Sequence, residues 1–117
     1  MSIAVEFLPG PGILMVRVYA QWRAAERLVA VKSVEAHGCY RPGIPVLVDG
    51  THVARDGLSD VRALGAALAS SLEGSRIAIV VSSRVSTATQ TYTTGAAVFT
   101  SREDALGWLT AREAPEK

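Results

Sequence analysis

The chain has 117 residues, of which 49% are hydrophobic and 20% are charged. This size suits one domain with one hydrophobic core, and no segment reaches the roughly 20 apolar residues of a membrane-spanning helix. Twelve basic residues oppose eleven acidic ones for a formal net charge of +1, so no general positive field attracts nucleic acid or an anionic membrane. We therefore expect a folded, soluble domain with no nucleic-acid partner and no membrane insertion.

The cysteine content and the amino-terminal segment indicate a cytoplasmic location. Cys39 is the single cysteine of the chain and cannot form an internal disulfide, which is usual in a reducing compartment. The amino-terminal segment lacks the basic region and the small-residue cleavage site of a signal peptide.

Two short apolar, β-branched runs open the sequence, at 3–8 and 13–19. They are separated by Pro-Gly-Pro-Gly at 9–12, which predicts a turn and hence an antiparallel hairpin. Apolar residues occupy both alternating sets of the second run, although Arg17 interrupts one of them. We therefore expect both faces of this strand to be at least partly covered.

A first helix and a buried strand follow the hairpin. Strong helix formers cluster over 21–36, and the helical spacing predicts a buried face made by Ala24, Leu28 and Val31. The apolar run at 44–49 predicts a short buried strand. Pro45 belongs at its start, because proline cannot donate a hydrogen bond within a sheet.

The second helix has the strongest periodicity in the chain. Ser59 fits the N-cap and Asp60 the positive helix terminus. The predicted buried stripe consists of Val61, Leu64, Leu68 and Leu72. After it, the unbroken apolar run within 76–81 predicts a central parallel strand covered by helices on both faces.

The carboxyl-terminal part predicts a short helix within the hydroxyl-rich stretch 82–94, a strand at 96–99 and a closing helix. Ser101 and Asp104 have the spacing of a capping box for the closing helix. Its predicted buried face consists of Ala105, Trp108 and Leu109. We expect one α/β domain over 1–112 and a frayed tail at 113–117.

The predicted order is β-β-α-β-α-β-α-β-α, a mostly parallel sheet with an amino-terminal hairpin and helices packed on it. This order and the patterns at 41–49, 56–68 and 98–109 resemble the STAS family, the fold of anti-anti-sigma factors, and in particular a bacterial branch of it that is grouped with SEC14-like domains. The resemblance spans nearly the whole chain. It implies a regulatory or protein-binding module, because the three patterns specify strands, turns and caps and not catalysis.

The resemblance also draws attention to Ser59. In anti-anti-sigma factors a serine at the start of the second helix, within an Asp-Ser-Ser-Gly-like motif, is phosphorylated and so switches binding to a kinase. This chain has Asp56-Gly57-Leu58-Ser59 there and lacks the serine pair. Ser59 is thus a candidate phosphorylation site, with the role of a simple N-cap as the alternative.

Ligand-binding residues are expected beyond the carboxyl ends of the parallel strands, in the loops 49–56 and 82–86. The candidate side chains for a polar or anionic ligand are His52, Arg55, Asp56, Ser83 and Arg84. For each of them, a solvated loop side chain is the alternative.

No motif indicates catalysis, a metal or a cofactor. His37 and His52 are the only histidines, and neither has the spacing of a zinc site or the companion residues of a hydrolytic triad. The glycines form neither a dinucleotide fingerprint nor a phosphate-binding loop. We therefore expect a protein that is not an enzyme and holds no cofactor.

Two functions remain for comparison, besides an enzyme that would use His52 and would need a nucleophile or substrate anchor in contact with it. The first is a regulatory module that binds a partner protein, or a second copy of itself, through the exposed faces of its second and third helices. The second is a carrier of a small apolar or lipid-like ligand, with a cavity left beside the small-residue helix 63–69.

Overall fold

Six strands form one mixed sheet in the computed structural model, which describes residues 3–19, 22–53, 58–72, 74–82, 91–93 and 96–110. The strands are β1 (Ile3–Leu8), β2 (Ile13–Val18), β3 (Val46–Asp49), β4 (Ile77–Val80), β5 (Thr91–Thr93) and β6 (Ala96–Phe99). A 3-10 turn, η1 (Ala24–Glu26), precedes the helices α1 (Arg27–Glu35), α2 (Leu58–Ser71) and α3 (Arg102–Thr110).

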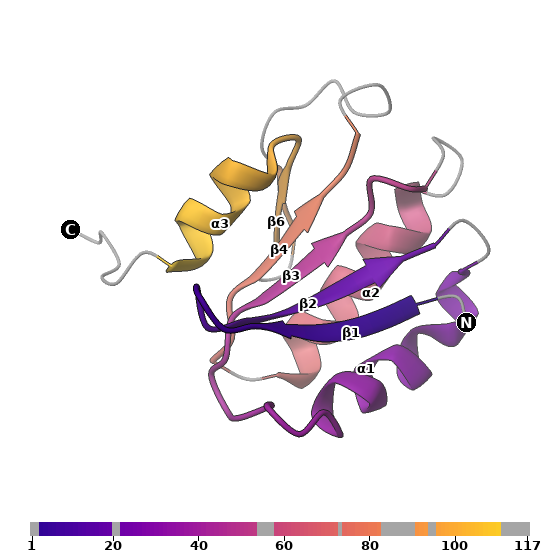
Figure 1. Ribbon diagram of the computed structural model, residues 1–117. Helices are drawn as coiled ribbons and strands as arrows, with labels where there is room; N and C mark the ends of the chain where they lie inside the picture. The colour runs from indigo at the N-terminus through magenta and orange to yellow at the C-terminus, as the bar shows by residue number, and fades with distance from the viewer. Residues whose placement is uncertain are drawn as a thin grey trace.

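The strand order is β1-β2-β3-β4-β6-β5. The four inner strands β2, β3, β4 and β6 run parallel to one another, and the two edge strands β1 and β5 pair antiparallel with their neighbours. The predicted amino-terminal hairpin, mostly parallel sheet and central position of β4 are confirmed. Figure 1 shows α1 and α2 behind the sheet and α3 in front of it.

Alternate residues of each strand enter two separate cores. In β2, Leu14, Val16 and Val18 point into the core beneath α1 and α2, whereas Ile13 and Met15 point into the core beneath α3. The β4 residues divide in the same way, with Ile77 and Ile79 on the first side and Ala78 and Val80 on the second. Coverage on both faces explains why β4 is apolar at every position.

The α2 stripe predicted from the sequence is confirmed, because Val61, Leu64, Leu68 and Leu72 are all buried. Gly65 lies between them at the closest approach of α2 to the sheet. A Cβ atom built on Gly65 would overlap the side chain of Ile79 on β4. The small residues of this helix thus bring it closer to the sheet.

The buried face predicted for the first helix is wrong in part. Leu28 is 65% exposed, and the helix instead buries Ala30, Val31 and Val34. The helix begins at Arg27 after the 3-10 turn, later than predicted, and it packs against both α2 and β1. Since apolar residues occur on nearly every side of this helix, periodicity did not determine which side would be buried.

Two further predictions need correction. Residues 91–93 form strand β5, paired antiparallel with β6, where a short helix had been expected. The run Thr91-Tyr92-Thr93 consists of β-branched and aromatic residues, which favour a strand once β6 offers a partner. The structure also places Ser59 inside α2, which begins at Leu58, and not at the N-cap position.

The closing helix α3 is fixed at both ends. The Ser101 hydroxyl accepts a hydrogen bond from the Asp104 backbone N–H at 3.2 Å, which confirms the predicted N-cap. Near the other end, an Arg76 N–H group donates to the Trp108 carbonyl at 2.6 Å, and the guanidinium lies 5.3 Å from the centroid of that indole. Ala105 and Leu109 are buried as predicted, while Trp108 is only half-buried beneath Arg76.

Candidate functional site at the carboxyl ends of β2 and β3

The loop after β3 is held by the side chain of Asp49. Its Oδ1 accepts hydrogen bonds from the Thr51 hydroxyl at 2.6 Å and from the Thr51 backbone N–H at 3.1 Å. Gly50 packs so closely that a Cβ atom there would lie 3.0 Å from the Val61 side chain and 3.2 Å from the Val80 carbonyl. The first turn of this loop is therefore fixed by both sequence and packing.

Arg17 joins this loop to the amino-terminal hairpin. Its guanidinium lies 3.5 Å from Glu6 Oε2 on β1 and 3.9 Å from Asp49 Oδ2 on β3. The β2–β3 register pairs Arg17 directly with Asp49. The hairpin register pairs Arg17 with Ala4, so Glu6 lies two residues further along β1 on the same face of the sheet. Because Arg17 faces two carboxylates, it is not available as a free cation for an anionic ligand.

Tyr19 and His52 extend the same group of side chains. Their rings stack with centroids 6.1 Å apart and an interplanar angle of 27°. The pKa of Arg17 is raised above its ordinary value, first by a hydrogen bond with Tyr19. Desolvation opposes this increase, and the charges of Glu6 and Asp49 add to it. We name this group the Arg17 cluster; it consists of Glu6, Arg17, Tyr19, Asp49, Thr51 and His52.

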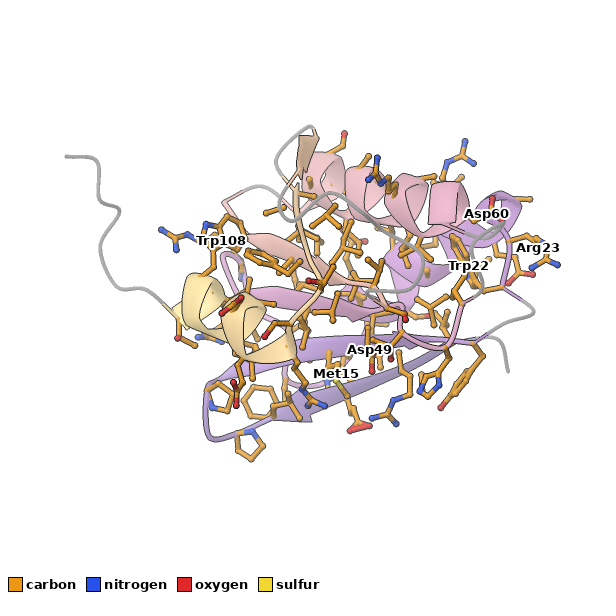
Figure 2. All side chains as sticks on the ribbon, turned by 90° about the horizontal axis from the view of Figure 1, so that it is seen from above. Met15, Trp22, Arg23, Asp49, Asp60 and Trp108 are labelled. Carbon is orange, nitrogen blue, oxygen red and sulfur yellow. The ribbon has the colours of Figure 1, made fainter. Side chains whose placement is uncertain are left out.

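The Arg17 cluster lies on the side of the sheet that carries α3. Figure 2 shows Met15 and Asp49 on this side and Trp22 and Asp60 towards α2. Met15 is buried, and Arg102 of α3 reaches its sulfur at 3.7 Å. Glu6 lies directly opposite Met15 on β1, and Arg17 lies two residues beyond Met15 on β2; their side chains are 45% and 31% exposed. Among the described residues, α3 covers the first part of β2 and leaves the Arg17 part accessible.

Only part of the predicted ligand site can be placed. His52 is exposed and stacks on Tyr19. Arg55, Asp56, Ser83 and Arg84 lie outside the described residues, and of Ser59 the backbone alone is described. The structure adds Glu6, Arg17 and Tyr19, which the sequence had placed in strands and had not connected with the loop.

In the described part of the chain, no group of three or more His, Cys, Asp or Glu side chains is placed to hold a metal ion. Nor does any described helix have the length and apolar character needed to cross a membrane. Cys39 is exposed, and its backbone N–H donates to His37 Nδ1 at 3.0 Å, within the turn that follows α1.

Comparison of the chain with protein-family models, with curated proteins and with solved structures gives no match. The observed class is an α/β domain with a mixed, mostly parallel sheet. The resemblance to the STAS family therefore stays a prediction.

Proposed function

We propose that this chain is a non-enzymatic regulatory module of STAS type that binds a partner protein on the open part of its sheet, over the Arg17 cluster. The observation that carries this proposal is the partial exposure of Arg17, Glu6, Tyr19 and His52 next to a well-packed core. Tyrosine and arginine are frequent among the residues that dominate protein interfaces.

The held geometry of the Arg17 cluster favours recognition of a protein surface. Arg17 is positioned by two carboxylates, and Asp49 is in turn positioned by Thr51. Side chains fixed before binding lose less conformational entropy when a partner docks. Mixed charges also select among partners, because an approaching surface must match both signs.

The alternative role as a carrier of an apolar ligand has less support. It required the small side chains of α2 to leave space beside the sheet. Gly65 instead approaches Ile79 so closely that no methyl group fits between them. Close approach of a small-residue helix removes volume at the place where the ligand would lie.

An affinity experiment tests the proposal. The tagged full-length chain is used to capture proteins from the cells that produce it, beside the variants Arg17→Glu and Lys32→Glu. Lys32 is exposed on α1, behind the sheet, so the second variant has the same charge change at a distant place. We expect a captured partner to be lost with Arg17→Glu and retained with Lys32→Glu.

Native mass spectrometry of the purified chain completes the test. We expect it to detect protein assemblies that contain no bound small molecule. A partner retained equally by both variants would contradict the assignment of the binding surface. A copurified lipid at one molecule per chain would favour the carrier role instead.

A further inference from the structure

The free edge of β1 is the longest unpaired strand edge in the described part of the sheet. β1 pairs with β2 at six consecutive positions without a bulge, and its other side has no neighbouring strand. The opposite edge strand, β5, has three residues. β1 also lacks proline and lysine, the residues that commonly protect such an edge from pairing with another chain.

The side chains of β1 add to this tendency. Val5 and Phe7 are only partly buried against the core beneath α1 and α2. Glu6 is the one charged residue of the strand. An added strand would cover the free backbone groups and the incompletely buried apolar side chains together.

We propose that β1 pairs antiparallel with β1 of a second copy of this chain, joining two sheets into one. This proposal goes beyond the proposed function, because it gives the chain a second contact surface, the free edge of β1, and takes a second copy of the chain as its occupant. The pairing register follows from the sequence of the strand. With Val5 opposite its own copy, Ile3 faces Phe7 of the second molecule and Ala4 faces Glu6, so residues of the same sheet face meet.

Other registers are less favourable. Moving the centre of the pairing to Glu6 would place two carboxylates directly opposite each other, which destabilises a strand pair. Moving it to Ala4 would shorten the ladder. Only some registers keep the helices of both copies on the same side of the joined sheet. Of these, the register centred on Val5 has the longest ladder without two charged residues facing each other.

A second observation concerns α1, which packs behind β1 (Figure 1). In the joined sheet the two α1 helices lie on the same side and next to the symmetry axis. Leu28 and Val29 of this helix are each 65% exposed and are the exposed large hydrophobic residues of the described chain. The helix that packs behind β1 thus also carries exposed apolar side chains.

Opposite charges introduced at Ala4 provide the test, because Ala4 faces Glu6 of the second copy but Arg17 of its own hairpin. Ala4→Glu should weaken the dimer about tenfold, since two symmetric Glu–Glu pairs arise, whereas Ala4→Lys should tighten it about threefold. The effects on the fold have the opposite signs: Ala4→Glu gains Arg17 as a neighbour and Ala4→Lys is repelled by it. A dimer that is weakened by Ala4→Glu and tightened by Ala4→Lys is therefore the opposite of what the contact with Arg17 alone would give.

The dissociation constant is measured by sedimentation velocity on the full chain, up to about 100 µM, where even weak dimers become populated. A strict monomer at this concentration would overturn the proposal. Equal effects of the two variants would do so as well, because the dimer would then use another surface. In both cases the capture experiment with Arg17→Glu still tests the proposed function separately. If the chain is monomeric and an Ala4 variant nevertheless loses the captured protein, the free edge of β1 binds a strand of a different protein and not a second copy.

Discussion

At the scale of single residues, Arg17 links three strands through their side chains. It contacts Glu6 on β1 and Asp49 on β3 from its own position on β2. Its side chain is 31% exposed and that of Asp49 is 13% exposed, so water screens much of the attraction. Partly exposed ion pairs of this kind contribute at most about 1 kcal/mol to stability.

Replacing Arg17 with Met should therefore lower the free energy of unfolding by only about 0.5 kcal/mol. The pKa of Arg17 is raised in the folded chain, so its stabilising effect is complete below the unfolded pKa and is lost only as the pH rises through the higher folded value. The difference between the variant and the natural chain should accordingly stay constant from about pH 6 to about pH 10. Urea denaturation at several pH values measures it.

A difference that changed sign or size across this range would show that another titrating group depends on Arg17. His52→Gln serves as the control. It removes the imidazole of the Arg17 cluster but keeps the Arg17 guanidinium with both of its carboxylates, so it separates the effect of the imidazole from that of the guanidinium.

The sequence predicted one part of this site and missed the other for a definite reason. The loop that contains Asp49 and His52 could be predicted, because ligand sites follow the carboxyl ends of parallel strands. Glu6 and Tyr19 join it only through the hairpin register and the β2–β3 pairing, neither of which a single sequence determines. The one available signal was Arg17, a charge that interrupts an apolar strand.

At the scale of elements, the contact between α2 and β4 decides how closely the helix packs. Alanine is the better helix former, by about 1 kcal/mol, so Gly65→Ala should stabilise α2 in isolation. In the folded chain the new methyl group meets Ile79, which is fully buried, and overpacking of a core costs about 1–3 kcal/mol. We expect a net loss of about 1 kcal/mol, measured by chemical denaturation.

Two companion variants separate these effects. Gly107 on α3 has open space around its Cα, so Gly107→Ala should show the helix preference alone and stabilise by up to about 1 kcal/mol. In the double variant Gly65→Ala with Ile79→Val, the removed methyl group makes room for the added one. The double variant should thus lose less free energy of unfolding than the two single variants together. If the two losses simply added, the contact between Gly65 and Ile79 would be contradicted.

Prediction of the elements succeeded where one pattern dominated. The α2 stripe and the unbroken run of β4 each allowed a single interpretation. The first helix and the stretch 82–94 did not, because apolar residues surround the former and hydroxyl residues fill the latter. Leu28 was consequently assigned to the core, and β5 was assigned to a helix.

At the scale of the whole molecule, the sheet separates two cores of unequal size. The core beneath α1 and α2 includes side chains from both helices and from most strands. The core beneath α3 depends on one helix, with Ala105 and Leu109 as its fully packed contacts. A layer held by fewer buried side chains opens at a lower free energy than the rest of the domain.

Truncation of one leucine in each core tests this inequality. Leu64→Ala should lower the global free energy of unfolding by about 4 kcal/mol and Leu109→Ala by about 2 kcal/mol, because Leu109 lies in the last turn of α3, where the structure relaxes more easily. Hydrogen exchange followed residue by residue should show faster exchange throughout the sheet for Leu64→Ala. For Leu109→Ala the acceleration should be greatest within α3. Equal acceleration in every element by both variants would instead mean that the two cores open together as one cooperative unit.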